Sequence, residues 1–150
     1  MDDHNPLKLE NQICFPLYAC SKEIIKLYKP FLDDLDLTYT QYITMMVMWE
    51  YKNITAHELG EKLYLDSGTL TPMLKKLEQK GYITRARSKV DERNLDIAIT
   101  ESGIKLREKA LSVPSNLSKC IPLEAGKALE LYNTLNELLS LLKKWLYGQK

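Results

Sequence analysis

The hydrophobic residues of this 150-residue chain change their spacing at Gly81. Before Gly81, apolar side chains recur every three or four positions, which places them on one face of successive helices. After Gly81, residues 83–87 and 95–99 alternate between apolar and polar side chains, the spacing of half-buried strands. A polar turn over residues 88–94 separates the two runs. We therefore predict helices followed directly by a β-hairpin.

Capping residues mark where the helices before Gly81 begin and end. In a capping box, a threonine accepts a hydrogen bond from the first helical turn, and a glutamine or glutamate three residues later reaches back to it. The chain has this pattern twice, at Thr38/Gln41 and at Thr55/Glu58. The patterns predict helices over about 38–51 and 55–65, and a third helix covers about 67–80, with Gly81 just after its end. Two helices and a following hairpin are the order of a winged helix-turn-helix, so we expect a mainly α fold with a small β-hairpin wing.

Long amphipathic helices are predicted at both ends of the chain. One apolar stripe covers residues 9–30, where it is broken by Pro16, and another covers residues 122–145. A further helix over about 100–111 follows the hairpin and is interrupted at Pro114. The two terminal helices thus enclose the winged region in sequence.

The apolar stripes of the terminal helices are too extensive for a body of this size to cover. We expect them to pack against the same helices of a second subunit, in a homodimer. This single chain of 1–150 would then consist of dimerisation helices at 1–34 and 112–150 and a winged helix-turn-helix region at 35–111. The alternative is an intramolecular pair of terminal helices in a small bundle.

Composition excludes several classes of protein. With 45% hydrophobic and 27% charged residues, the chain has the balance of a soluble globular protein, and the net charge of +1 does not by itself indicate nucleic-acid binding. We find no uncharged apolar stretch of membrane-spanning length, so we expect a cytoplasmic protein without a membrane partner. The three cysteines have no metal-ligand spacing, so we expect no metal and no cofactor.

Residues 66–93 have the layout of a DNA-reading segment, in which a helix offers short polar side chains near its N-terminus and a hairpin offers cations. Hydroxyls there bond base edges or phosphates, and basic side chains contact the backbone. The candidate DNA-binding residues are Asp66, Ser67, Gly68, Thr69, Thr71, Lys75 and Lys76 on the helix, and Arg85, Arg87, Asp91 and Arg93 in the wing. The helix taken alone has another interpretation, in which Ser67 or Thr69 is only an N-cap and the lysines only form a solvent-exposed face.

The wing carries a specific resemblance. Asp91-Glu92-Arg93-Asn94, followed by Ile99-Thr100 and Gly103, matches the D-x-R and L/I-T-x-x-G signature of the MarR family of winged-helix regulators. Residues 65–75, 9–19 and 37–42 resemble its OhrR branch, the organic-hydroperoxide-sensing repressors, which is related to the thiol-switch regulators of staphylococci. The resemblance implies an intertwined dimer that represses genes by occupying a pseudo-palindromic operator in double-stranded DNA.

The same resemblance implies a thiol switch at Cys14. A cysteine senses oxidants only as its thiolate, and tyrosine hydroxyls are neutral donors able to stabilise that anion. In the OhrR branch, tyrosines matching Tyr28 and Tyr39 bond the sensing cysteine, and one matching Tyr18 lies close by. From its place on an amphipathic helix alone, Cys14 would be a small buried hydrophobe, which is how we interpret Cys20.

The implied mechanism is oxidation of Cys14 by a peroxide to the sulfenic acid, followed by condensation with a second thiol and release of the operator. Two routes are open. One uses a low-molecular-weight thiol, and the other uses Cys120 of the partner subunit as the resolving thiol. Pro16 leaves two geometries open near Cys14, because the helix either begins close to Phe15 or is kinked there.

Three rival functions remain at this stage. One is a thiol-switch regulator of broader virulence or metabolic programmes, and another is a MarR-type regulator of a small aromatic ligand, with the tyrosines as pocket wall. The third is a thiol peroxidase using Cys14. We expect no enzyme, and assign no catalytic residue, because no histidine or arginine stands beside Cys14 in sequence.

Overall fold

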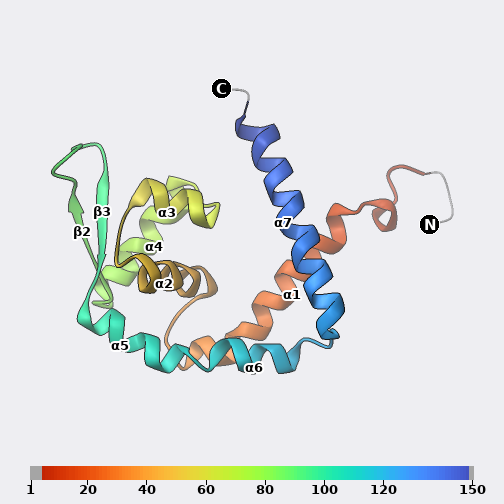
Figure 1. Cartoon of the computed structure of the whole chain (residues 1–150), viewed down its shortest axis with the longest axis horizontal. Helices are drawn as coiled ribbons and strands as arrows, with labels where there is room; N and C mark the ends of the chain where they lie inside the picture. The colour runs from red at the N-terminus through yellow and green to blue at the C-terminus, as the bar shows by residue number, and fades with distance from the viewer. Residues whose placement is uncertain (1–4, 149–150) are drawn as a thin grey trace. The chain divides into compact units, whose positions relative to one another are not determined.

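The computed structural model describes residues 5–148, so the predicted segments 1–34 and 112–150 extend at their outer ends beyond the described part. The elements form two compact units, one reaching to Leu117 and the other beginning at Ser118. A 3-10 turn at Leu9–Asn11 precedes α1 (Cys14–Asp33), α2 (Tyr39–Tyr51), β1 (Asn53–Thr55), α3 (Ala56–Leu63), α4 (Ser67–Gln79), β2 (Ile83–Arg87), β3 (Leu95–Ile99), α5 (Glu101–Ala110), α6 (Val113–Cys120) and α7 (Ala125–Tyr147) (Figure 1).

The winged helix-turn-helix prediction is confirmed: α3 and α4 precede the β2–β3 hairpin, which extends away from the helices (Figure 1). The hairpin belongs to a three-stranded antiparallel sheet of order β1-β3-β2. In that sheet Ile54 of β1 and Arg85 of β2 both face Ile97 of β3 in register. Strand β1 was not predicted, because three residues are too few to show alternation and Thr55 already served as a helix cap.

Both capping boxes are formed as predicted. Thr38 Oγ1 accepts from the Gln41 amide and Thr55 Oγ1 from the Glu58 amide, and in each case the later side chain accepts from the threonine amide. These reciprocal bonds satisfy amides that the first helical turn leaves without backbone partners. They fix the starts of α2 and α3.

Gly81 ends α4 as predicted. Its φ is +76°, the left-handed region that glycine enters without a Cβ penalty. The Gly81 amide donates to the Glu78 carbonyl at 2.8 Å, and the Tyr82 amide donates to the Leu77 carbonyl at 3.1 Å. This is a Schellman motif, and it turns the chain from α4 directly into β2.

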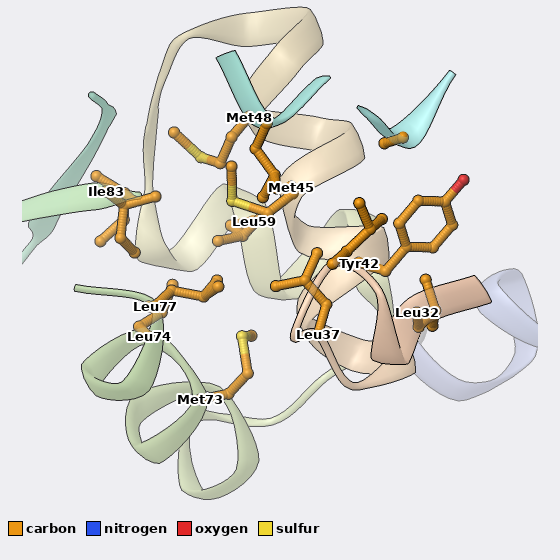
Figure 2. Close-up of a cluster of buried hydrophobic side chains, with 14 of the residues drawn as sticks. Leu32, Leu37, Tyr42, Met45, Met48, Leu59, Met73, Leu74, Leu77 and Ile83 are labelled. Carbon is orange, nitrogen blue, oxygen red and sulfur yellow. The ribbon is translucent and has the colours of Figure 1, made fainter. Parts of the chain in front are cut away.

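The core of the first unit lies where α2, α3, α4 and the sheet meet (Figure 2). Helix α4 contributes the predicted stripe, and Leu74 and Leu77 are at most 1% exposed. Met45, Met48, Leu59, Ile83 and Ile97 meet them from the other elements, and each is also at most 1% exposed. Burial of this kind stabilises a fold by about 1.5–3 kcal/mol for each large apolar side chain.

Gly103 explains the T-x-x-G part of the wing signature. Thr100 caps α5 by accepting from the Gly103 amide at 3.1 Å, and the Gly103 carbonyl accepts from Trp49 Nε1 at 2.8 Å. A Cβ on Gly103 would overlap the Tyr82 carbonyl oxygen and lie 2.8 Å from Ile99 Cγ1. The base of the wing therefore requires glycine at this position.

Helix α1 resolves the alternatives at Pro16. The helix begins at Cys14, which makes Pro16 its third residue. The first four amides of a helix have no intrahelical partner, so proline at this position costs no hydrogen bond. The predicted stripe ends at Pro30, but the helix continues past it to Asp33 and buries Leu32 in the core at 2% exposure.

The region between α5 and α7 also differs from the prediction. The helix predicted over about 100–111 does end before Pro114, as α5 at Ala110. Pro114 itself lies in the first turn of a separate helix, α6. Pro122 does not open the last helix. Glu124 keeps an extended backbone with ψ 145°, so α7 begins only at Ala125.

The terminal helices leave their apolar side chains exposed. None of the described residues of α7 is buried, and in α1 the one buried residue is Leu32. The exposed apolar residues include Phe15, Leu17, Ile24 and Leu27 on α1, and Leu131, Leu138, Leu139, Leu142 and Trp145 on α7.

Candidate nucleic-acid interface and thiol site

Helix α4 presents a polar face at its N-terminal end. Asp66 is the N-cap: its carboxylate accepts from the Thr69 amide at 2.9 Å and from Thr69 Oγ1 at 3.3 Å. The hydrogen bond from the Thr69 backbone amide is the largest cause of the lowered pKa of Asp66. Ser67, Gly68 and Thr71 lie exposed beside it. Asp66 serves as the cap, and Ser67 and Thr71 are exposed near the N-terminal end of α4.

The turn before α4 depends on a close backbone approach. Gly60 of α3 accepts from the Leu65 amide at 3.0 Å, and a Cβ on Gly60 would lie 2.9 Å from the Leu65 carbonyl oxygen. Leu59, beside it, is fully buried. Helix α3 therefore supports α4 from behind, as a helix that reads DNA requires.

Exposed cations lie on α4 and on the wing. Lys75 and Lys76 lie exposed on α4, and Arg87 lies exposed on β2. Arg93, in the turn of the wing, has a side chain that is 91% exposed, and Val90 at the same turn is 97% exposed. The wing thus ends in an exposed tip with a positive charge beside it.

Asp91 shapes that tip. Its carboxylate accepts from the Arg93 amide at 3.1 Å and from Arg93 Nε at 3.2 Å, and its carbonyl accepts from the Asn94 amide at 2.8 Å. These bonds close the turn and hold the guanidinium outward, which accounts for the D-x-R signature. An exposed ion pair adds little stability, so the role of Asp91 is geometric.

Arg85 differs from the other wing cations. Its side chain is 18% exposed, and NH2 lies 2.7 Å from Glu78 Oε2 on α4. Sequence reasoning grouped Arg85 with the DNA-contacting residues, but the structure brings it together with a carboxylate of the same chain. No local signal could have shown this, because the pair forms across the turn at Gly81.

The candidate thiol lies at the start of α1. Cys14 is the first residue of the helix and is exposed. Tyr18 stands one turn further along, 60% exposed, and its hydroxyl accepts from Lys22 Nζ at 3.1 Å. Helix N-termini favour anions, and both side chains are open to solvent, as a thiol that meets peroxides requires.

The other two predicted tyrosines lie far from Cys14 in the same chain. Tyr28 follows Cys14 by 14 residues on the continuous helix α1, which corresponds to a separation of roughly 21 Å along the axis. Tyr39 packs against Tyr28, and their ring centroids are 4.9 Å apart. A single chain therefore brings Cys14 together with Tyr18 but not with Tyr28 or Tyr39.

Tyr42 extends this aromatic cluster and was missed from the sequence. Its ring centroid is 5.9 Å from that of Tyr28, and the residue is 3% exposed. The signal was available, because Tyr42 follows Tyr39 by three residues on α2 and so shares its face. Burial, and then the charges of Tyr39 and Tyr42, raise the pKa of Tyr28 to about 12. The phenol is a hydrogen-bond donor at neutral pH.

Cys20 and Cys120 are both exposed, Cys20 on α1 and Cys120 as the last residue of α6. The interpretation of Cys20 as a buried hydrophobe is wrong for the single chain, because the face of α1 that carries it is uncovered. Within residues 5–148, no helix combines the length and apolarity needed to cross a membrane.

Comparison with known proteins gives a consistent result. Residues 26–110 match the family described as "Transcriptional regulator SarA/Rot". The chain is 55% identical over 115 residues to the "Organic hydroperoxide resistance transcriptional regulator" of Bacillus subtilis (strain 168), covering 77% of each protein. It is 43% identical over 132 residues to the "HTH-type transcriptional regulator SarZ" of a Staphylococcus saprophyticus strain, covering 88% of this chain and 90% of SarZ.

Solved structures of a protein called AbfR have the same fold. The reduced form bound to DNA superposes with a TM-score of 0.77 at 36% identity, over 92% of this chain and 94% of AbfR. The overoxidized form bound to DNA superposes with a TM-score of 0.68 at 38% identity, over 87% and 94%. The resemblance found from the sequence is thereby confirmed.

Proposed function

Because this chain belongs to the SarA/Rot family of transcriptional regulators, we propose that it is a redox-sensing repressor that binds operator DNA when Cys14 is reduced and releases it when Cys14 is oxidised. The observation that carries the proposal is the placement of Cys14, exposed at the first residue of a helix whose own chain leaves its apolar face open. The likeness to a hydroperoxide resistance regulator and to reduced and overoxidized AbfR supports the same assignment. Such a regulator acts where the DNA is, in the cytoplasm.

The proposed DNA-binding surface consists of the N-terminal face of α4 and the wing. Ser67, Gly68, Thr69 and Thr71 would enter a major groove, with Asp66 holding the first turn of α4. Lys75 and Lys76 would contact phosphates, and Arg87 and Arg93 would reach the adjacent minor groove. Two such surfaces related by a two-fold axis match a pseudo-palindromic operator.

The proposed dimer forms through the terminal helices. Their exposed leucines and aromatic residues need a cover, and a second copy of the chain offers the same surface in a symmetric contact. The regions 1–34 and 112–150 would then supply the dimer interface and 35–111 the DNA-binding region.

The dimer would also complete the thiol site. In a contact with two-fold symmetry, if one residue of the first subunit contacts a second residue of the partner, then the same two residues also contact each other with the subunits exchanged. If the two α1 helices cross antiparallel near Ser21, midway between Cys14 and Tyr28, then Cys14 of one subunit reaches Tyr28 and Tyr39 of the partner subunit. Tyr28 is protonated at neutral pH, because its pKa is about 12, and can donate to the thiolate. Tyr18 would complete the site from the same chain as Cys14.

The chemistry proposed for this site begins with attack of the Cys14 thiolate on a peroxide oxygen. The S–O bond forms as the O–O bond breaks, and the departing alkoxide takes a proton and leaves as an alcohol. The sulfenic acid then condenses with a second thiol, an S–S bond forms, and water leaves. The second thiol is either a low-molecular-weight thiol or Cys120 of the partner subunit. Either adduct alters the α1 contact and with it the spacing of the two DNA-binding surfaces.

The decisive experiment measures binding to an operator that the reduced protein selects from random duplexes. We expect one equivalent of cumene hydroperoxide per subunit to release the DNA, and a thiol reductant to restore binding. Cys14→Ser should bind and stay bound, whereas the matched control Cys20→Ser should respond like the parent. Release of DNA by Cys14→Ser under the same conditions would refute the proposal.

The resolving thiol is identified by a second experiment. After hydroperoxide treatment without added thiols, a non-reducing gel should show a covalent dimer in the parent if Cys120 resolves the sulfenic acid. Loss of that dimer in Cys120→Ser would support the intersubunit route. A covalent dimer that persists in Cys120→Ser would favour another thiol.

One observation favours a second candidate function, the regulator of a small ligand. A hollow of about 380 Å³ in the first unit is lined by Tyr42, Trp49 and Pro114, and also by the charged residues Arg107 and Glu50. A ligand that acted there would release the operator from Cys14→Ser as well as from the parent. A thiol peroxidase, by contrast, would consume hydroperoxide in many turnovers, whereas the repressor should consume about one equivalent per thiol.

A further inference from the structure

We propose that Glu78 and Arg85 form a positioning link that sets the wing at a fixed angle to α4, so that Arg85 supports DNA binding without touching DNA. The inference rests on the DNA-binding part of the proposed function and is independent of the thiol switch. It assigns a role to Glu78, which no motif identified, and changes the role of Arg85.

The link has three hydrogen bonds between two elements. The Arg85 amide donates to Glu78 Oε1 at 3.1 Å, Arg85 Nε donates to Glu78 Oε2 at 3.0 Å, and NH2 donates to the same oxygen at 2.7 Å. The carboxylate therefore holds both the backbone and the side chain of one residue. Charge-assisted bonds of this kind are stronger and more directional than neutral ones.

The position of the link suits a geometric role. Glu78 lies in the last turn of α4, and Arg85 is the central residue of β2, with only a short turn between the two elements. Strand β2 is at the edge of the sheet, and the Arg85 amide donates to Glu78 and not to β3. The Glu78 carboxylate thus joins α4 to the outer edge of β2, which faces away from β3.

Burial separates Arg85 from the wing cation Arg93, which would contact DNA. The side chain of Arg85 is 18% exposed, against 91% for Arg93, and its charge is compensated by Glu78. The bond from the Arg85 side chain is also the largest cause of the lowered pKa of Glu78, so the carboxylate stays ionised at neutral pH. A compensated charge displaces few counterions from DNA.

The test compares operator affinity over a range of KCl concentrations for Glu78→Gln, Arg85→Lys, the double variant and Arg87→Gln. A positioning link predicts that Glu78→Gln and Arg85→Lys each weaken binding about tenfold, with an unchanged salt slope. The double variant should bind no more weakly than either single variant. Arg87→Gln, which removes a positive charge proposed to reach the minor groove, should instead lower the salt slope by about one.

The opposite results would overturn the inference. A phosphate contact by Arg85 predicts that Arg85→Lys retains affinity, because lysine keeps the charge, and that Glu78→Gln binds as tightly as the parent or more tightly. Thermal melts of the free proteins confirm that each variant is folded.

Failure of the proposed function would look different, because the parent itself would then select no operator. In that case the link is judged by amide exchange in the free protein. Arg85 should exchange faster in Glu78→Ala than in the parent, and equal exchange rates would contradict the link.

Discussion

The winged region and the terminal helices of this chain differ in how far their apolar side chains are buried. Between α2 and β3, apolar residues of different elements pack against one another, and Met45, Leu59, Leu77 and Ile97 are completely buried. On α7 no described residue is buried, and Trp145 is 71% exposed. The winged region buries its apolar residues within one chain, whereas the apolar stripes of the terminal helices lie exposed in the single chain.

This difference assigns the two tasks of a sensor to two kinds of structure. A rigid, self-sufficient region can hold reading residues at fixed positions. A region that depends on contact between subunits can change its geometry when a side chain within the contact is modified. In the proposed dimer, Cys14 lies in the second kind of region, and Ser67 and Arg93 lie in the first.

The largest effect should come from a charge on the exposed stripe of α7. Leu138→Glu should raise the dissociation constant of the dimer by about 10²–10⁴-fold. The reason is that a buried leucine contributes about 1.5–3 kcal/mol and a two-fold interface contains it twice. Sedimentation equilibrium measures the effect.

Asn133→Glu is the matched control, because Asn133 lies on the opposite side of α7. It should leave the dimer intact. If Leu138→Glu remained dimeric at the concentration where the parent does, the terminal helices would not need a partner and the comparison would fail.

A smaller effect is expected at the base of the wing, within the self-sufficient region. Gly103→Ala should lower the free energy of unfolding by about 1–3 kcal/mol, because its Cβ would overlap the Tyr82 carbonyl oxygen and crowd Ile99. Urea titration followed by tryptophan fluorescence measures it, since Trp49 donates to the Gly103 carbonyl.

Gly126→Ala provides the comparison, because its Cβ would meet its nearest neighbour at 3.9 Å, in ordinary contact. It should be neutral or slightly stabilising in helix α7. Equal losses for Gly103→Ala and Gly126→Ala would mean that the close approach at the wing base does not matter.

The smallest effect is a pH dependence at Tyr28. Burial raises the pKa of Tyr28 in the folded chain from 10.0 to about 12, so folding favours the neutral phenol. Its contribution to stability is fully present below pH 10 and is lost as the pH rises through 12. Tyr28→Phe should therefore lessen the fall in unfolding free energy between pH 10 and 12, and the same change at exposed Tyr64 should not. An identical fall in parent and Tyr28→Phe would show that Tyr28 titrates normally.

Local chemistry made much of the winged region predictable. The capping boxes at Thr38 and Thr55 and the left-handed Gly81 involve residues within a few positions of each other, so their geometry can be read from short patterns. The alternating hairpin strands were predictable for the same reason. The first residues of α1 and α7 were less predictable, because Pro16 and Pro122 are each compatible with more than one starting residue of the helix.

Contacts between elements were not predictable. The Glu78–Arg85 link and the pairing of Ile54 with Ile97 depend on where the sheet lies against the helices, which no pattern in either segment specifies. The candidate thiol site was predicted by resemblance, and the pattern of tyrosines alone did not show that one chain separates Cys14 from Tyr28 by 14 residues of a continuous helix.

The most direct test of this account uses mixed dimers. One chain carries Cys14→Ser, and the other carries Tyr28→Phe and Tyr39→Phe, with Cys20→Ser and Cys120→Ser in both. The single Cys14 then has its intact tyrosines only in the other subunit. We predict that this Cys14 reacts with iodoacetamide at pH 7 as fast as Cys14 of the parent dimer, and faster than in the dimer of two Phe chains. A rate as slow as that of the Phe dimer would contradict a thiol site completed by the partner subunit.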